Sequence, residues 1–461
     1  MAIARPIPEL APVTTAIFPA SRLDIGFDSY KDLGTRAPSS KDIPVSDVIQ
    51  PDLDLAASLF EALSGATRRG RGIVRDSYGA GEQAAHDLVR SAAAGVGLEI
   101  SVDAIGNLFT TLPGRDRSAP RIIMGSHLDS VPQGGNYDGA AGVVAGLCVL
   151  SAMRRARVVP KCDLSVMAIR AEESAWFDIA YLGSGGAFGL LDPACLSIAR
   201  SDNGLTLEAT LKQRGFDPQP IRERRRLLDP ARIRAYLELH IEQGPTLVAR
   251  GLPAAVVSGI RGCKRFRNAR CTGEYAHSGA VSRPYRRDAV AATVAFLHHM
   301  ETLWVQQEEA GADLVLTAGE LYTDPTMHGP SKIAGETRFV LDLRSLSEAT
   351  MDSVAAEARG AAARISSAYR VHIDLGATSD SPPAVMDPRL RSRLMSLLDR
   401  PFEMASGAGH DAAVFAKVGI PSAMIFVRNE HGSHNPDEAM SLDDFAVGSR
   451  SLLGLLTDFP L

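Results

Sequence analysis

The stretch Gly125–Gly139, GSHLDSVPQGGNYDG, constrains the fold more than any other part of the sequence. It follows the apolar run Ile122–Met124, which indicates a buried strand, and a long helical pattern comes after it. An imidazole and two carboxylates in a glycine-rich loop predict a metal site. His127 and Asp138 would be ligands, and Asp129 would hold the other ring nitrogen of His127. The alternative is a polar loop between a strand and a helix, in which these side chains are merely solvated.

Composition narrows the class of protein. A chain of 461 residues is expected to form two or three domains. Its net charge of -5 and the lack of a long basic stretch argue against nucleic-acid binding. No apolar run approaches the roughly 20 residues of a membrane helix, and residues 1–19 make a poor signal peptide. Five cysteines without a CxxC pair argue against a disulfide framework, so we expect a cytoplasmic location.

The periodicity of apolar residues predicts an interrupted α/β domain. Residues 1–50 are rich in Pro, Ser and Asp, and are expected to form an N-terminal arm. Residues 51–260 and 376–461 alternate helical patterns with apolar strands, such as Leu108–Leu112 and Leu164–Ile169. This alternation favours an α/β sheet that is covered by helices on both faces.

Residues 261–375 have a different pattern. They are expected to follow the order β-α-β-β-α-β, which is a self-sufficient two-layer unit of the ferredoxin-like kind. The simplest organisation is therefore one catalytic domain that is interrupted by a small inserted domain.

Further polar segments resemble the opening stretch in their position. Most of them follow or end an apolar strand, and ligands gather at the carboxyl ends of strands in α/β sheets. The segments are Arg170–Ser174, Tyr236–Pro245, the glycine-rich loop Ser406–Asp411 and Arg428–Glu438. Together they offer three imidazoles and two carboxylates for metal binding: His127, Asp138, Glu173, His240 and His434. If Asp138 bridges, two divalent ions each receive three protein ligands and keep open positions, as hydrolytic sites require.

Glu172 and Glu173 cannot easily perform the same task, because adjacent residues of an extended chain point to opposite sides. We expect one of them to bind metal and the other to face the attacking water as a general base. Taken alone, such an acidic pair is more often a solvated strand end, and a lone histidine is more often structural. The prediction therefore rests on the five matches occurring together.

At this point the sequence resembles the M20 metallopeptidase superfamily, and within it the amidase, hydantoinase and carbamoylase group. The resemblance covers roughly residues 70–455. Its most specific segments are GSHLDSVPQGGNYDG, LELHIEQGP, SGAGHDA and SHNPDE. It implies an α/β fold with a phosphorylase/hydrolase-like catalytic domain, a sheet covered by helices, and an inserted ferredoxin-like lid and dimerisation domain. A homodimer through this lid is expected.

The resemblance also implies a role for each residue of the metal site. Two divalent ions are expected per subunit, with zinc first and manganese, cobalt or nickel as alternatives. Glu172 would activate the water and later protonate the leaving nitrogen. The metal ligands would be His127 and His240 for one ion, Glu173 and His434 for the other, and Asp138 as the bridge.

Residues outside the metal site are assigned by the same resemblance. His277 would stabilise the oxyanion, typically in the site of the partner subunit, as a hydrogen-bond donor aimed at developing negative charge. Arg344 would bind the substrate carboxylate, because its planar fork matches that group. The alternatives are a surface-turn role for His277 and a strand-edge ion pair for Arg344. The further candidate substrate contacts are Gln243, Ser331, Gly409 and His410.

The sequence departs from the family pattern around the substrate pocket. Ser331 stands where the family usually has asparagine, and Ser174-Ala-Trp-Phe177 replaces Gly-Ser-Arg-Phe. The segment Ala280–Arg283 replaces Thr-Thr-Pro-Met, and the loop Asn429–Gly432 is also atypical. This loop contains His431, but we prefer His434 as the ligand because Asn-Pro follows it, as in the family.

The leading hypothesis is a dimetal amidohydrolase that cleaves a linear amide or ureido C–N bond of a small carboxylate-bearing substrate. An N-carbamoyl-L-amino acid or a related ureido acid is the first expectation. One alternative is an N-acyl-amino-acid deacylase or dipeptidase on the same scaffold. A remote alternative is a non-catalytic metal- or ligand-binding protein that has kept the fold.

Overall fold

The structure is a computed structural model that describes residues 49–458 of the chain. The predicted N-terminal arm, residues 1–50, therefore lies almost entirely outside the described residues. None of the helices in the described range is long and apolar enough to cross a membrane.

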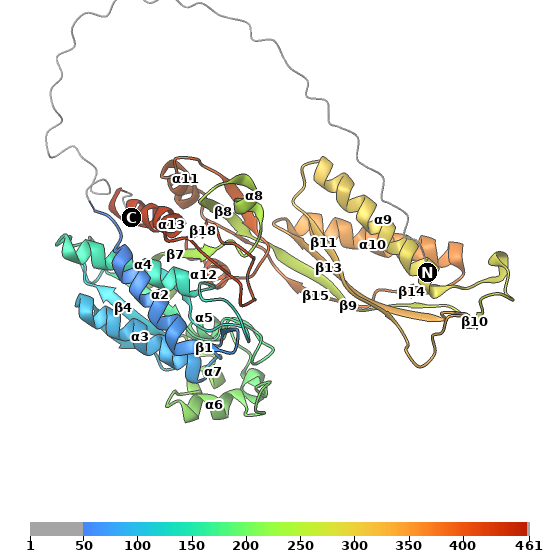
Figure 1. Cartoon of the computed structure of the whole chain (residues 1–461), viewed down its shortest axis with the longest axis horizontal. Coiled ribbons are helices and arrows are strands. Elements are labelled where there is room, and N and C mark those ends of the chain that lie inside the picture. Colours follow the sequence, from blue (N-terminus) through green and yellow to red (C-terminus); the bar gives the residue numbers. More distant parts are fainter. Residues whose placement is uncertain (1–48, 459–461) are drawn as a thin grey trace, which may run out of the picture. The chain divides into compact units, whose positions relative to one another are not determined.

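A nine-stranded mixed sheet organises most of the described chain (Figure 1). Its strands follow the order β16-β8-β18-β7-β5-β6-β4-β3, and β17 pairs with β8. The central strands β18, β7, β5 and β6 are parallel, so their carboxyl ends lie at one edge of the sheet. The strands are β3 (Glu99–Val102), β4 (Leu108–Leu112), β5 (Arg121–His127), β6 (Leu164–Ile169), β7 (Ile233–Ile241), β8 (Ala254–Ile260), β16 (Ala384–Val385), β17 (Glu403–Ser406) and β18 (Ser422–Val427).

Apolar side chains cover both faces of this sheet. In β18, Ile425 belongs to one hydrophobic cluster and its neighbours Met424 and Phe426 belong to another, because successive side chains point to opposite faces. Helix α4 is buried all round and packs between the sheet and the helices outside it. The first cluster includes residues of α2 (Leu53–Thr67), α3 (Ala80–Val96), α4 (Ala140–Arg155), α11 (Pro388–Ser396) and α13 (Leu442–Asp458), and the second includes residues of α5 (Leu182–Ala187), α8 (Thr246–Arg250) and α12 (Asp411–Lys417).

Short segments complete this part of the chain. A small separate hydrophobic cluster includes Tyr78, Trp176 and Leu211. The segments are β1 (Arg68–Arg69), β2 (Gly72–Ile73), α6 (Leu207–Gln213), α7 (Gln219–Arg222) and the 3-10 turns Pro193–Ser197 and Pro230–Arg232.

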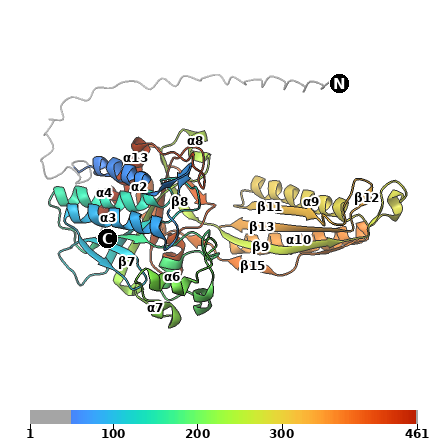
Figure 2. The ribbon, with the colours of Figure 1, turned by 60° about the horizontal axis from the view of Figure 1, so that its bottom comes forward.

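A separate antiparallel sheet is formed by residues between Gly262 and Ser381 (Figure 2). Its strand order is β11-β13-β9-β14, and β15 also pairs with β9. The main elements follow the β-α-β-β-α-β order that the sequence predicts: β9 (Gly262–Thr272), α9 (Ala289–Glu309), β11 (Val315–Thr323), β13 (Glu336–Ser345), α10 (Glu348–Tyr369) and β14 (His372–Asp374), followed by β15 (Thr378–Ser381).

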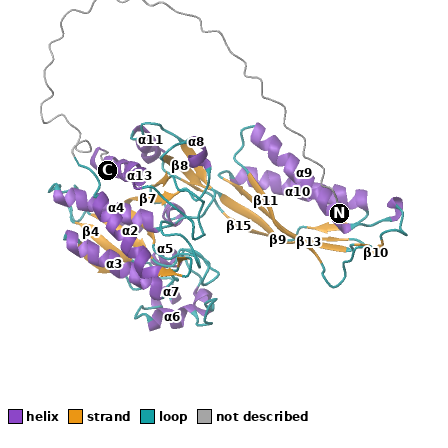
Figure 3. Cartoon of the chain, viewed as in Figure 1, coloured by secondary structure: helices purple, strands orange, loops and turns teal. Residues whose placement is uncertain are grey.

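Both long helices of this region pack on one face of its sheet (Figure 3). Phe266 and Phe339 of the sheet are buried against Phe296 and Met300 of α9 and Val354 of α10. A small two-stranded sheet, β10 (Ala276–His277) with β12 (Lys332–Ile333), and the 3-10 turn Arg283–Tyr285 lie in the connections.

Candidate metal centre

The parallel strands bring the predicted ligands to one place. His127 is the last residue of β5, and His240 lies one residue before the end of β7. Glu172 and Glu173 follow the end of β6, and His434 lies in the loop after β18. Because these four strands end at the same edge of the sheet, side chains far apart in the sequence meet there.

Asp138 lies at the centre of the cluster. Its Oδ1 is 3.5 Å from Nε2 of His127 and 3.2 Å from Nε2 of His240. Its Oδ2 is 3.3 Å from Nε2 of His434, which is also 3.1 Å from Oε1 of Glu173. Asp138 therefore belongs to two groups of possible ligands, one with His127 and His240 and one with Glu173 and His434.

The chemistry of this donor set fits two divalent cations. In each group the ligand atoms lie within 4.8 Å of one another, and nitrogen and oxygen donors of this kind suit zinc, manganese, cobalt or nickel. Burial opposes the ionisation of Asp138, but the three imidazoles outweigh it and hold the pKa of its carboxyl well below the usual range. Asp138 and Glu173 together raise the pKa of His434 to about 10. Such a strongly negative field favours bound cations.

Asp129 supports both His127 and the acidic pair. Its carboxylate lies 3.4 Å from Nδ1 of His127, and its backbone oxygen lies 3.1 Å from the same nitrogen. It also accepts hydrogen bonds from the backbone N–H groups of Glu172, at 3.0 Å, and Glu173, at 3.1 Å. The Ser77 hydroxyl donates to it at 2.6 Å. The sequence analysis predicted the contact with His127 but missed the contacts with the glutamates and Ser77.

The predicted metal ligands line a cavity. Glu172 lines the same cavity, and its residue is 8% exposed. Burial is the main cause that raises the pKa of its carboxyl well above the usual range; His127 opposes this rise, and Glu173 and Asp411 add to it. A carboxyl group with a raised pKa can both take up a proton and return it near neutral pH.

A glycine is required beside the first ligand. Gly139 has a φ of 65°, and a Cβ atom there would come within 2.5 Å of the imidazole ring of His127. Glycine at position 139 therefore lets the backbone beside Asp138 come close to the imidazole ring of His127.

Glu438 links two ligand-bearing loops and was not predicted from the sequence. Its Oε1 accepts hydrogen bonds from the backbone N–H groups of Tyr137, at 2.7 Å, and Asp138, at 3.2 Å. The hydroxyl of Ser433 lies 2.6 Å from both Oε2 of Glu438 and Oδ2 of Asp138. Because Glu438 ends the segment SHNPDE, the signal that could have found it was present in the sequence.

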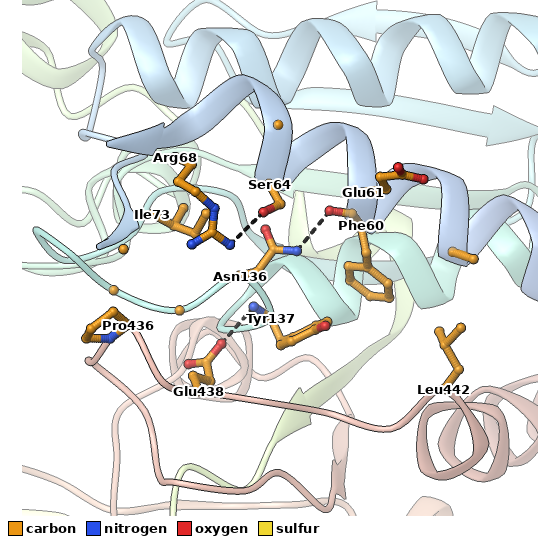
Figure 4. Close-up of a pocket in the computed structure, with 15 residues that line it drawn as sticks. Phe60, Glu61, Ser64, Arg68, Ile73, Asn136, Tyr137, Pro436, Glu438 and Leu442 are labelled. Atoms are coloured by element: carbon orange, nitrogen blue, oxygen red, sulfur yellow. Dashed lines mark hydrogen bonds between the residues drawn. The ribbon is translucent and has the colours of Figure 1, made fainter. Parts of the chain in front are cut away.

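Glu438 also lines a second cavity, which has a volume of about 540 Å³ (Figure 4). Phe60 of α2, Arg68 of β1, Tyr137 and Glu438 line it, and Asn136 donates to the backbone oxygen of Phe60 at 2.9 Å. The loop of Asp138 is thus held against α2 as well as against the loop of His434.

The predicted substrate contacts of the catalytic part fall into two groups. Gln243 and Gly409 line the cavity of the cluster, and Nε2 of Gln243 donates to Oδ2 of Asp138 at 2.9 Å. The Oε1 of Gln243 is buried and has no hydrogen-bond partner among the described residues. His410 is buried and does not line the cavity; its Nε2 lies 2.9 Å from the hydroxyl oxygen of Ser406, and its ring packs against that of His240.

Three predicted substrate contacts lie between residues 261 and 375. None of them, His277, Ser331 or Arg344, lines this cavity within the described single chain. His277 is exposed, and its Nδ1 accepts hydrogen bonds from the backbone N–H groups that follow it. The backbone oxygen of Ser331 accepts from the N–H of Ser278 at 2.9 Å. Arg344 pairs with Asp342 and donates to the backbone oxygen of Gly407 at 2.7 Å.

Two residues that the sequence analysis singled out have clear positions. His431 is exposed and lies outside the ligand groups, whereas His434 belongs to one of them. Trp176 is buried and donates from its indole nitrogen to the backbone oxygen of Ser130 at 2.8 Å, so it supports the ligand loop from outside the cavity.

Comparison with known proteins places the chain in a family. Residues 123–458 match the model of Peptidase family M20/M25/M40. The chain is 34% identical over 388 residues to the N-carbamoyl-L-amino acid amidohydrolase of Geobacillus stearothermophilus, and the match covers 83% of this chain and 92% of that protein. It is 30% identical over 373 residues to the allantoate amidohydrolase of Bacillus subtilis (strain 168), covering 80% and 88% of the two chains.

A solved structure agrees. A hydantoinase/carbamoylase family amidase from Burkholderia ambifaria superposes with a TM-score of 0.78 at 32% identity, and the match covers 89% of this chain and 97% of that one. The protein therefore belongs to the M20 peptidase family, in its hydantoinase/carbamoylase amidase group.

Proposed function

We propose that the protein is a dimetal amidohydrolase that cleaves a linear amide or ureido C–N bond of a small carboxylate-bearing substrate, first an N-carbamoyl-L-amino acid. The observation that carries this proposal is the sharing of Asp138 between two ligand groups, with Glu172 in the same cavity. The amidohydrolase class follows from the family, and the ureido substrate is suggested by the N-carbamoyl-L-amino acid and allantoate amidohydrolases to which the chain is similar.

Bound divalent ions would polarise the scissile carbonyl and make a water molecule acidic enough to attack near neutral pH. Glu172 takes the proton of this water and returns it to the leaving nitrogen, a task that suits its buried carboxyl. Asp129 keeps Glu172 and Glu173 in place through their backbone N–H groups. The free Oε1 of Gln243 accepts a hydrogen bond from the ureido or amide end of the substrate.

The second sheet supplies the remaining groups in this proposal. Residues 261–375 act as a lid and dimerisation domain on a catalytic domain of residues 51–260 and 376–461. Apolar side chains of α9 and the edge strand β11 are exposed, including Val294 at 56% and Leu321 at 49%, and such a surface suits a second copy of the chain. His277 then serves the partner subunit's site, and Arg344 binds the substrate carboxylate.

The alternative activity is that of an N-acyl-amino-acid deacylase or dipeptidase. The cavity of the cluster measures about 170 Å³, which suits a small substrate and disfavours long peptides. The remote alternative, a non-catalytic binding protein, is disfavoured because Glu172 and all five predicted ligands are present together.

The test is a substrate panel with purified protein and added zinc, manganese, cobalt or nickel. N-carbamoyl, N-acetyl and dipeptide derivatives of the same amino acids are assayed for release of ammonia or free amino acid. Faster hydrolysis of the N-carbamoyl series is expected, and Glu172→Gln should keep its metal while losing turnover. Absence of any hydrolysis with all four metals contradicts the proposal.

A further inference from the structure

Apart from the predicted metal site and Gln243, small side chains form most of the cavity wall. Ser174, Ala180, Ala408 and Gly409 offer a single side-chain polar atom between them. Tyr181 is the exception, because it brings a phenol into this wall. It lies at the start of α5, beyond the sharp turn that follows the acidic pair.

The hydroxyl of Tyr181 is held against Gly409. A Cβ atom on Gly409 would come within 1.9 Å of the Tyr181 hydroxyl oxygen and 3.1 Å of the ring carbon that carries it. The space that a side chain at position 409 would fill is therefore taken by this hydroxyl. Gly409 and Tyr181 both line the cavity, so the hydroxyl lies at the cavity wall.

The backbone of Tyr181 is constrained in a way that fixes the phenol relative to Glu172. Tyr181 has a φ of 62° and a ψ of 34°, a left-handed conformation that is rare for a bulky side chain. Its N–H donates to the backbone oxygen of Glu172 at 2.9 Å. Strained backbone of this kind persists where the surrounding structure demands a particular side-chain direction.

The surroundings of the phenol decide which hydrogen-bonding role is free. Burial raises the pKa of Tyr181 well above its usual value, and Glu172 and Asp411 raise it further, so the phenol stays neutral. A neutral phenol oxygen has lone pairs that can accept a hydrogen bond from a donor in the cavity. The described residues make no hydrogen bond to this oxygen. Oε1 of Gln243 is buried and has no partner among them either.

We propose that Tyr181 determines specificity for the terminal group of the substrate, because its hydroxyl oxygen accepts a hydrogen bond from the NH2 of a carbamoyl group. That NH2 has two N–H donors, and the cavity offers two unpaired acceptors, Tyr181 and Gln243. An acyl methyl group donates nothing and would leave both acceptors without a partner. This inference rests on the proposed function and narrows its substrate class to ureido acids.

The test is Tyr181→Phe in the full-length protein, because this change removes only the hydroxyl. With kcat and KM measured for the N-carbamoyl and N-acetyl derivatives of one amino acid, we expect kcat/KM for the carbamoyl substrate to fall by about tenfold or more. The acetyl substrate should be hydrolysed as before or faster. Equal changes for both substrates, or no change, overturn the inference.

Tyr78→Phe is the matched control. Tyr78 is another buried tyrosine with a left-handed backbone, at a φ of 54°, and its hydroxyl also has no partner among the described residues. It does not line the cavity, so its variant should keep the wild-type ratio of the two substrates. A changed ratio in Tyr78→Phe would show that loss of any buried hydroxyl alters selectivity, and would overturn the assignment to Tyr181.

Binding gives a second readout that needs no turnover. In a Glu172→Gln background, adding Tyr181→Phe should weaken the Kd for the N-carbamoyl amino acid by a similar factor and leave the Kd for the N-acetyl amino acid unchanged. If the wild type hydrolyses neither substrate but this difference in Kd persists, the proposed function fails and the recognition by Tyr181 stands. If neither ligand binds, both fail.

Discussion

The backbone N–H of Glu172 donates a hydrogen bond of 3.0 Å to the carboxylate of Asp129. This bond joins the segment after β6 to the loop that follows β5. The carboxylate that accepts it is fully buried. The position of the proposed general base therefore depends on a residue that does not itself line the cavity.

Asp129→Asn is expected to weaken metal binding and turnover together. An asparagine amide offers one acceptor oxygen instead of two, so one of the N–H groups of Glu172 and Glu173 loses its partner. A loss of about 10- to 100-fold in metal affinity is expected, as for other residues that orient metal ligands. Isothermal titration of the metal-depleted protein with zinc measures it.

The control for this variant is Asp163→Asn. Asp163 also accepts a backbone hydrogen bond, from Gly114 at 2.9 Å, and it lies at the opposite end of β6 from the cluster. Wild-type affinity in Asp129→Asn would show that the buried carboxylate only supports the fold.

The sequence could predict which residues lie together at the candidate metal site, because they lie in short motifs at the ends of regular strands. The bounds of β4 and β6 match the prediction to the residue, since both strands are fully buried and mostly apolar. The ligand positions then follow from the parallel strand order, and Asp138 lies between the two groups as predicted.

Contacts between distant loops could not be predicted in the same way. Ser77 reaches the site from another segment, and nothing in its local sequence indicates that it meets Asp129. Tyr181 lines the cavity after the chain passes through two left-handed residues, Asp178 and Tyr181 itself, and periodicity does not encode this course. His410 was expected to contact substrate; its ring contacts the hydroxyl of Ser406 and is not part of the cavity lining.

His434→Ala is expected to lower the bound metal from two equivalents to one. His434 contacts both Asp138 and Glu173, so its loss leaves that ion with two carboxylate ligands. His431→Ala is the matched control, because His431 lies three residues earlier in the same loop and is exposed. Elemental analysis after dialysis measures both variants. Loss of metal in His431→Ala with retention in His434→Ala would reverse the assignment.

Gly409→Ala and Tyr181→Phe are expected to be non-additive. The new Cβ atom would collide with the Tyr181 hydroxyl at 1.9 Å, and overpacking of this kind costs about 1–3 kcal/mol. Removal of the hydroxyl leaves the ring carbon at 3.1 Å, so the double variant should recover much of this loss. Thermal unfolding of the four proteins forms a double-mutant cycle.

Gly95→Ala is the control for the glycine change. Gly95 lies inside α3, and no heavy atom lies within 4 Å of its built Cβ position, so this variant should be as stable as the wild type or slightly more stable. Additive effects of Gly409→Ala and Tyr181→Phe would contradict the contact between residues 181 and 409.

Mixing two inactive variants tests whether His277 serves the partner subunit. His277→Ala and Glu172→Gln should each lose turnover. If a dimer brings His277 across, each mixed dimer regains one of its two sites. Mixed dimers make up half of the dimers in an equal mixture, so about a quarter of wild-type activity should return after the subunits exchange. Return of no activity, with exchange verified by mass spectrometry, would place His277 in the site of its own chain or outside the reaction.

His86, a buried histidine outside the metal site, should make the free energy of unfolding depend on pH. It is buried in α3, and neither ring nitrogen has a hydrogen-bond partner in the described structure. Burial lowers the pKa of His86 well below its usual value, and Arg170 and Arg90 lower it further. The folded protein thus keeps this ring neutral, whereas the unfolded chain takes up a proton below its ordinary pKa of about 6.5.

Stability that depends on neutral His86 is therefore present above about pH 6.5 and is lost as the pH falls, by about 1.4 kcal/mol per pH unit. His86→Leu removes this contribution. The difference in unfolding free energy between pH 7.5 and 5.5 should be smaller in the variant by about 1.4 kcal/mol, as measured by urea unfolding. Contributions from the metal ligands are common to both proteins and cancel in the comparison. An unchanged pH dependence would mean that His86 gains a proton in the folded state.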